Sequence, residues 1–237
     1  MKLSAPIYQL KRRAKLLARN EKLPLHDALD RIAREEGFAG WSLLSSRLTL
    51  EHPSRAIFSR LADGDLLLLA ARPGHGKTML GLRILLDAAL AGRRAVFFTL
   101  EYTELETRAR IRSLDDSANS PGDRLEIVTS NDISAHFIVE HLSGSPRGTV
   151  AVIDYLQILD QQRNKPALSE QMALLQEFAR TTGVILGFIS QIDRDFVPEA
   201  GPMPGVEHIR LPNPIGHSVF SKACFLHQGK VQFQDLA

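Results

Sequence analysis

The chain has 237 residues, of which 44% are hydrophobic and 24% charged. This composition excludes a wholly disordered chain, a collagen-like repeat and a disulfide-stapled miniprotein. The single cysteine, Cys224, cannot form an internal disulfide, and the first residues lack the apolar stretch of a secretory signal, so we expect a cytoplasmic protein. The longest hydrophobic run, 66–71, is too short to cross a membrane. The net charge of +2 neither requires nor excludes nucleic acid.

Residues 1–52 are predicted to form a small, basic, all-helical module. Seven lysines and arginines oppose one acid, Glu21, within residues 1–22, and apolar residues recur there every three or four positions, which indicates a basic amphipathic helix. Two further helices are predicted after Pro24 and around Trp41, and we expect Trp41 to anchor the small core rather than to stack on a base. The basic helix could bind the phosphates of DNA or RNA, or its charges could simply face solvent.

Residues 53–237 are predicted to form one α/β domain. A connector opens at Pro53, and from residue 66 strands alternate with helices. This order favours a mainly parallel sheet with helices on both faces. Two short β-like runs near the C-terminus flank Gln228 and Gly229, a pair typical of a hairpin turn. The predicted strands are 66–70, 95–100, 125–128, 149–153, 184–190, 223–227 and 230–233, and the predicted helices are 78–90, 104–114, 136–142 and 169–181.

A phosphate-binding loop is predicted between the first strand and its helix. It consists of Ala71, Arg72, Pro73, Gly74, His75, Gly76, Lys77 and Thr78. The two glycines let backbone N–H groups wrap a polyphosphate, and the helix N-terminus adds partial positive charge. Lys77 would reach the β- and γ-phosphates, and the Thr78 hydroxyl would hold Mg²⁺. We therefore expect ATP and Mg²⁺ as cofactors, with the side chains of Arg72 and His75 facing solvent.

Three polar residues follow predicted strands, at the edge where open α/β sheets bind ligands. Asp154 directly follows strand 149–153. It could contact Mg²⁺ directly or through water, or it could simply start a loop. Glu101 follows strand 95–100 and could polarise the water that attacks the γ-phosphate; alternatively it is a helix N-cap or a solvated acid. Gln191 follows strand 184–190 and could sense the γ-phosphate, or be a plain loop amide.

Four segments together resemble the ATPase domain of DnaB-type replicative helicases, which has the RecA-like P-loop fold. They are Gly-Asp-Leu-Leu-Leu-Leu-Ala-Ala-Arg-Pro-Gly-His-Gly-Lys-Thr over 64–78, Phe-Thr-Leu-Glu over 98–101, Val-Ile-Asp-Tyr-Leu-Gln over 152–157 and Ser-Gln-Ile-Asp-Arg over 190–194. They occur in the family's order, and the resemblance covers about residues 57–233. It implies that Lys77 and Thr78 bind nucleotide and Mg²⁺, Glu101 is the catalytic base, Asp154 binds the metal, and Gln191 couples the γ-phosphate to DNA-binding loops.

Candidate contacts to DNA are sparse. Arg163 and Lys165 lie in a polar loop just past Asp154, and Arg210 stands where the family has a basic DNA loop. The family's C-terminal Lys-x-Arg-Asn-Gly motif, whose cations reach into a neighbouring subunit's site, has no full counterpart, because Lys230 is the only cation nearby. Since such a finger is worth about three to five orders of magnitude in rate in related chemistry, we expect a slow ATPase.

Two functions follow as hypotheses, besides a third possibility, a truncated remnant of a mobile element that binds nucleotide but turns over poorly. The favoured one is a RecA-like ATPase that acts on single-stranded DNA, with the hexameric ring of the family as its implied assembly. The alternative is an ATP-dependent switch or loader that docks on a partner protein through residues 1–50 and has weak or no helicase activity. Self-assembly separates them, because a ring helicase should form nucleotide-dependent hexamers.

Overall fold

The computed structural model describes residues 4, 7–44, 53–114, 122–160, 166–193, 196, 203–209 and 217–236. The chain divides into two compact units, residues 1–56 and 57–237, and each is described by itself. In the part of the chain that the structure describes, no helix is both long and apolar enough to span a bilayer.

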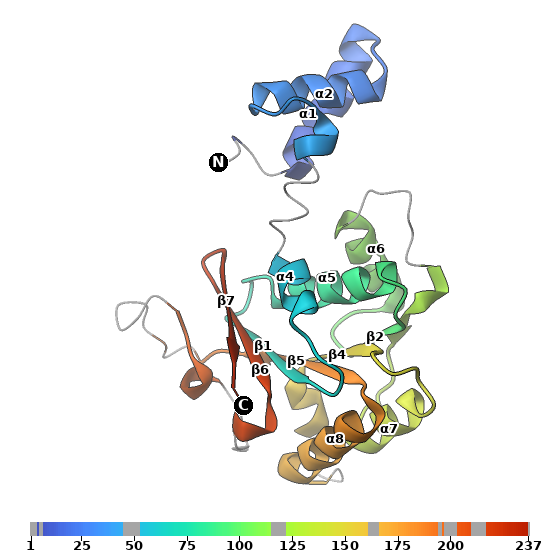
Figure 1. The fold of residues 1–237 in the computed structure, drawn as a ribbon, viewed down its shortest axis with the longest axis vertical. Helices are drawn as coiled ribbons and strands as arrows, with labels where there is room; N and C mark the ends of the chain where they lie inside the picture. The colour runs from blue at the N-terminus through green and yellow to red at the C-terminus, as the bar shows by residue number, and fades with distance from the viewer. Residues whose placement is uncertain are drawn as a thin grey trace. The chain divides into compact units, whose positions relative to one another are not determined.

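The first unit is built on two helices, α1 (Ile7–Glu21) and α2 (Leu25–Glu35) (Figure 1). Leu10 and Ala14 of α1 are fully buried against Ala28 and Ile32 of α2, and the partly buried Trp41 packs on the same cluster. The predicted amphipathic helix and the structural role of Trp41 are therefore confirmed. The predicted third helix begins at Trp41, and residues 45–52 lie outside the described part of the chain.

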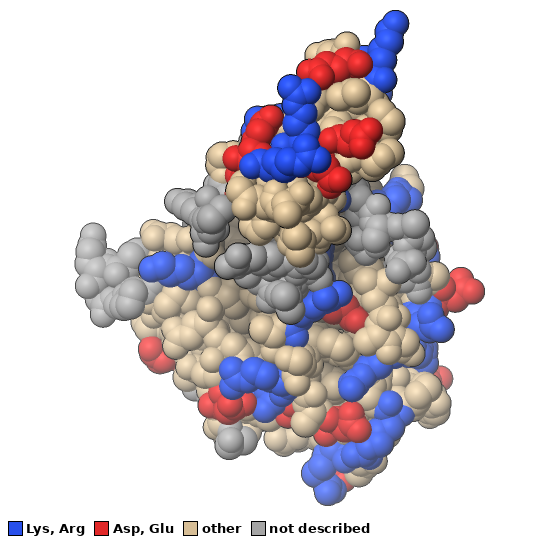
Figure 2. Space-filling model, turned by 45° about the horizontal axis from the view of Figure 1, so that its top comes forward, with Lys and Arg blue, Asp and Glu red and all other residues tan. Residues whose placement is uncertain are grey.

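Opposite charges join the two helices of this unit. Arg13 of α1 forms a 2.8 Å ion pair with Glu35 of α2, and Glu21 of α1 forms a 2.7 Å pair with Arg31 of α2. Figure 2 shows lysine and arginine side chains beside acidic ones on this unit. The acids of α2 thus face part of the positive charge that the N-terminal sequence concentrates on α1.

The second unit is a seven-stranded sheet in the order β3-β2-β4-β5-β1-β6-β7. All neighbouring strands pair in parallel except β6 and β7, which form an antiparallel hairpin. The α/β fold with a mainly parallel sheet is therefore confirmed. The strands are β1 (Leu66–Ala71), β2 (Ala95–Thr99), β3 (Leu125–Val128), β4 (Val150–Asp154), β5 (Ile185–Gln191), β6 (Lys222–His227) and β7 (Lys230–Asp235).

Helices cover both faces of the sheet (Figure 1). On one face α5 and α6 enclose a core that includes Phe97, and on the other α7 and α8 enclose a core that includes Phe98. Successive side chains of a strand point to opposite faces, so this phenylalanine pair contributes to both cores. The helices are α5 (Lys77–Leu90), α6 (Glu104–Leu114), α7 (Ala135–Leu142) and α8 (Leu168–Thr182).

The sequence places most elements within two residues of their observed ends, but one helix differs from expectation. A connector is predicted at Pro53, where the structure has helix α4 (Pro53–Ser59). Proline suits the first position of a helix because its missing N–H has no intrahelical partner there, and seven residues are too few to show a periodic pattern. The hairpin turn is confirmed: Gln228 and Gly229 both have positive φ, 48° and 77°.

Candidate nucleotide-binding site

The loop between β1 and α5 has the backbone of a phosphate cradle. Gly74 and Gly76 adopt φ of 79° and 84°, in the left-handed region that favours glycine. A Cβ atom built on either residue would meet nothing within 4 Å, so the positive φ rather than crowding favours glycine, and the adjacent space is open. Lys77 begins α5, which places the helix N-terminus and its unpaired N–H groups at this loop.

Two residues at the start of α5 meet the end of β4. Lys77 and Thr78 are both only 9% exposed, and the Thr78 Oγ1 donates a 2.9 Å hydrogen bond to Oδ2 of Asp154. Asp154 is fully buried, and its other oxygen, Oδ1, has no hydrogen-bond partner. Burial, and secondarily the negative charge of Glu101, raises the pKa of Asp154 to about 6, although the Thr78 hydrogen bond and the charge of Lys77 oppose this rise.

These groups fit a magnesium ion. A buried carboxylate oxygen without a partner costs free energy unless a cation or a donor meets it, and hydroxyl and carboxylate oxygens are ligands that Mg²⁺ prefers. Within the described ranges, no group of three or more histidine, cysteine or acidic side chains could hold a metal ion unaided. The residues therefore suit a cation that also draws ligands from a bound polyphosphate.

The strand order brings the other predicted residues to the same edge. Thr99, the last residue of β2, is paired with Asp154, and Glu101 follows two residues later with an exposed side chain. The Glu101 backbone N–H donates to the Thr99 hydroxyl at 3.1 Å, which fixes the turn that carries the carboxylate. Gln191 ends β5 directly beside Ala71 of β1, where the phosphate loop begins.

Arg72 and His75 are held by other segments, which corrects the expectation that they face solvent. Both are partly buried. The Arg72 guanidinium donates to the carbonyl oxygen of Phe196 and lies 5.7 Å from the centre of its ring. The His75 ring stacks on that of His227 with centroids 5.4 Å apart, and its Nδ1 accepts a long, 3.4 Å hydrogen bond from the N–H of Gln228.

Phe196 and His227 are neighbours of the loop that the sequence did not reveal. Their rings lie edge to face with centroids 5.5 Å apart. His227 is 4% exposed, and its pKa is lowered first by burial and then by the positive charges of His75, Arg72 and Lys230. Its position at the loop depends on β6 pairing with β1, a neighbour relationship that spacing along the chain cannot predict.

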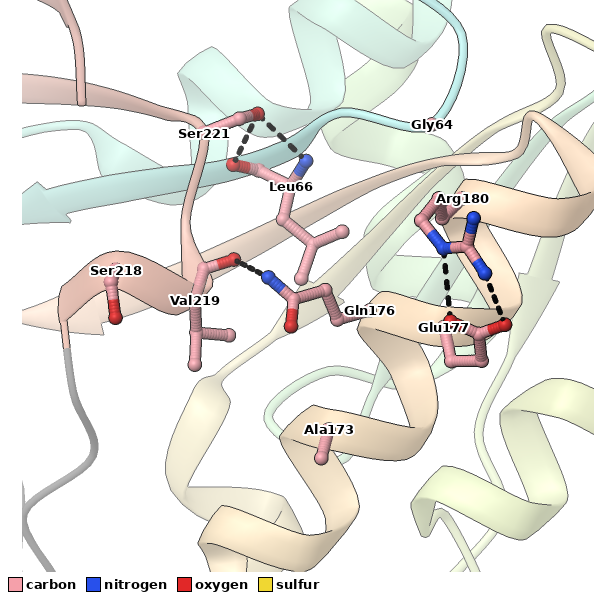
Figure 3. Close-up of a pocket in the computed structure, with 9 residues that line it drawn as sticks. All are labelled: Gly64, Leu66, Ala173, Gln176, Glu177, Arg180, Ser218, Val219 and Ser221. Carbon is pink, nitrogen blue, oxygen red and sulfur yellow. Dashed lines mark hydrogen bonds and ion pairs between the residues drawn. The ribbon is translucent and has the colours of Figure 1, made fainter. Parts of the chain in front are cut away.

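The candidate DNA contacts Arg163, Lys165 and Arg210 lie outside the described residues, so they stay predictions. A separate cleft of about 440 Å³ opens at the opposite, amino end of the strands (Figure 3). Leu66, Gln176 and Arg180 line it, and Gln176 donates a 3.3 Å hydrogen bond to the carbonyl of Val219 across it. This cleft is therefore distinct from the phosphate loop.

Comparison with known proteins agrees with this architecture. The model of the DnaB-like helicase C-terminal domain matches residues 55–135. A probable plasmid replicative DNA helicase of Chlamydia muridarum is 24% identical over an alignment of 180 residues, and the match covers 63% of this chain and 40% of that protein. The DNA repair protein RadA of Pseudomonas aeruginosa is 27% identical over an alignment of 148 residues, and the match covers 60% of this chain and 31% of that protein. The chain thus spans well under half the length of either relative.

Solved structures share the fold. A DnaB-like replicative helicase, solved with its interactions with primase, aligns over 93% of this chain and 67% of its own with 17% identity and a TM-score of 0.59. The ATPase domain of G40P aligns over 79% of this chain and 82% of its own with 18% identity and a TM-score of 0.54. A KaiC-like protein of Pyrococcus horikoshii OT3 aligns over 73% of this chain and 79% of its own, with 16% identity and a TM-score of 0.53.

The family model covers the phosphate loop, α5, β2 and the Glu101 turn, and the solved structures extend the likeness of fold over most of the chain. The resemblance of this chain to the ATPase domain of DnaB-type helicases, with its RecA-like α/β fold, is therefore confirmed.

Proposed function

We propose that this chain binds ATP with Mg²⁺ at the phosphate loop, hydrolyses it, and acts on single-stranded DNA. The observation that carries the proposal is the hydrogen bond between Thr78 and Asp154 beside the loop, with the second Asp154 oxygen buried and unpartnered. The oxygens of a buried carboxylate usually have hydrogen-bonding or ionic partners. A buried carboxylate with one unpartnered oxygen at this edge of the sheet therefore supports a ligand site.

Each residue has a role in this proposal. Backbone N–H groups of the loop and the Lys77 ammonium hold the phosphates, and Thr78 and Asp154 hold Mg²⁺, which neutralises charge on the phosphate oxygens. Glu101 is exposed at the end of β2 and orients the attacking water as general base. Gln191, beside the start of the loop, contacts the γ-phosphate and relays its presence to the segment after β5.

The alternative remains an ATP-dependent switch or loader that docks on a partner protein. It is favoured by the C-terminal hairpin, in which Lys230 is the only lysine or arginine between residues 227 and 234. A site without an arginine finger would turn over slowly while still binding nucleotide tightly enough to change shape. A hexameric ring belongs to the first function, whereas a switch can act without one.

Steady-state ATP hydrolysis with and without single-stranded DNA tests the proposal, together with direct nucleotide binding. Lys77→Ala should abolish nucleotide binding, because it removes the cation that meets the phosphates. Glu101→Gln should retain nucleotide binding but lower kcat by about 10²- to 10⁴-fold. The matched control is Glu104→Gln, three residues further on, which removes an exposed acid paired with Arg108 and should leave turnover unchanged.

The outcomes separate the two functions. Turnover that DNA stimulates and that Lys77→Ala and Glu101→Gln abolish supports a nucleic-acid-dependent ATPase, and nucleotide-dependent hexamers in light scattering support a ring. Nucleotide binding with negligible turnover, unchanged by DNA, contradicts the motor and supports the switch. A protein that binds no nucleotide contradicts both.

A further inference from the structure

The outer surface of α1 carries three exposed cations whose charged groups pair with none of the described residues. They are Arg12, Lys15 and Arg19, which we call the basic face of α1. At 100° per residue these positions fall within an arc of about 60°, so they share one side of the helix. The buried residues Leu10 and Ala14 lie on the opposite side of α1, against α2.

The acids among the described residues of this unit have other partners. Glu35 pairs with Arg13 and Glu21 pairs with Arg31, while Glu36 accepts hydrogen bonds from the backbone N–H and the hydroxyl of Ser4. In the described part of the chain, none of the three residues of the basic face has an ion pair or a hydrogen-bonding partner for its charged group. Their charge is therefore available to a partner molecule.

We propose that the basic face of α1 binds the phosphodiester backbone of a nucleic acid. Arg12 and Arg19 are seven positions apart, so the face extends about 10 Å along the helix axis, close to three nucleotide steps of a strand at about 3.4 Å each. Guanidinium groups match phosphate geometry as two-pronged donors, and the lysine adds a point charge. Such contacts give affinity without reading base sequence.

Two other partners fit this surface less well. A membrane-binding helix inserts its apolar face into lipid, but the apolar face of α1 is buried against α2, which leaves Leu16, 51% exposed, beside the cations. A stable protein partner normally needs an apolar or aromatic anchor at the centre of its interface, and Trp41, the unit's single tryptophan, is partly buried and packs against the core. A row of cations with little apolar surface favours a phosphate backbone.

This inference does not depend on ATP binding, since the phosphate loop lies in the other unit. Its test uses the full chain without nucleotide, with Arg12→Gln, Lys15→Gln and Arg19→Gln combined, because glutamine keeps helix propensity while removing charge. The matched control combines Arg108→Gln, Arg147→Gln and Arg180→Gln, which removes three charges that are already paired with Glu104, Asp63 and Glu177. Circular dichroism and urea unfolding verify that both variants fold.

Binding is measured by fluorescence anisotropy with a labelled 30-nucleotide single strand, the matching duplex and an RNA of the same sequence, across a salt series. Loss of three phosphate contacts should weaken single-strand binding by about 100-fold at 0.1 M salt and reduce the slope of log affinity against log salt by about 2. The control variant should change either quantity much less. A variant with Arg12→Lys and Arg19→Lys should bind much more tightly than the triple glutamine variant and retain most of the parent's affinity, because all three positive charges are present.

The proposal is overturned if the triple variant binds all three nucleic acids with the parent's affinity and salt slope, or if the control variant weakens binding equally. It is also overturned if only binding to anionic vesicles or to polyglutamate depends on the basic face. The relative losses for single strand, duplex and RNA identify which backbone the face prefers, and any of them supports the proposal.

Discussion

Oγ1 of Thr78, in the first turn of α5, donates a 2.9 Å hydrogen bond to Oδ2 of Asp154, the last residue of β4. The two residues are 76 positions apart in the chain, and the bond joins the phosphate loop to the centre of the sheet. It satisfies one carboxylate oxygen and leaves the other without a partner. Full burial of this half-satisfied carboxylate raises the pKa of Asp154 to about 6.

Asp154→Asn should stabilise the metal-free protein at neutral pH. Because the pKa of Asp154 rises from 3.8 to about 6 on folding, the folded state keeps a proton that the unfolded state releases, and the free energy of unfolding falls as pH rises from about 4 to 6. Asparagine has no charge to bury. The variant's advantage should therefore grow with pH, to about 3 kcal/mol at pH 7.

Urea unfolding of parent and variant between pH 4 and 8, with EDTA present, measures this difference. With ATP and Mg²⁺ present, the parent should be the more stable of the two proteins. Bound nucleotide and metal then stabilise the parent, whereas the variant has lost a side chain that binds the metal. A difference in free energy of unfolding between parent and variant that does not change with pH would contradict this prediction. It would show that folding does not raise the pKa of Asp154.

His75→Ala should weaken nucleotide binding about three- to tenfold and leave kcat unchanged. The ring of His75 stacks on His227, and the contact holds the phosphate loop against the β6–β7 turn before any ligand arrives. Losing a ring contact of this kind costs about 0.5–1.5 kcal/mol. Affinity for a fluorescent ATP analogue is compared with that of His136→Ala, which removes an exposed histidine from α7. An equal effect of both substitutions, or a loss of kcat alone, contradicts this positioning role.

The glycine turns before α5 and the place of Asp154 at the end of β4 could be predicted from sequence, because each depends on a local pattern: glycines before a helix, or a carboxylate after an apolar strand. The contacts of Arg72 and His75 could not. They require β6 to lie beside β1 and Phe196 to return over the loop, and both follow from the order of strands across the sheet. Helix α4 was not predicted for a different reason. Its seven residues form about two turns, which are too few for a helical repeat of apolar residues to be recognised.

Gln171 illustrates a second long-range relationship that local patterns do not reveal. This residue of α8 is 1% exposed and makes three hydrogen bonds: its Oε1 accepts from the N–H of Ala135, and its Nε2 donates to the carbonyls of Leu159 and Pro166. Leu159 belongs to the 3₁₀ helix η2 (Leu156–Asp160), which follows Asp154. The amide thus ties the segment after Asp154 to α7 and α8.

Gln171→Leu should lower the free energy of unfolding by about 2–4 kcal/mol, because it leaves backbone groups of Ala135 and Leu159 buried without partners. Gln176→Leu, one and a half turns further along the same helix, removes one hydrogen bond to Val219 and should cost less than about 1 kcal/mol. Urea unfolding of both variants measures the difference. Similar small losses for both would mean that water or a shifted side chain satisfies the groups around position 171.

Cys224 should be unreactive in the folded protein. It is fully buried in β6, paired with Leu69 of β1 and Phe233 of β7, and burial raises the pKa of its thiol from 9.0 to about 12. The thiolate is the reactive form, so this shift lowers its population at pH 8 about 1000-fold, in addition to steric protection. Labelling with a thiol reagent should therefore occur only when β6 separates from its neighbours.

Because Cys224 is the single cysteine, its labelling rate reports the opening of this part of the sheet. The rate under native conditions should fall when ATP and Mg²⁺ are added, since a ligand on the phosphate loop stabilises the closed sheet, and it should not fall in Lys77→Ala. Protein unfolded in guanidinium gives the rate of the free thiol, and Cys224→Ala gives the background. Rapid labelling in the folded state would show that the β6–β7 hairpin opens readily and that the stack of His75 on His227 does not hold it closed.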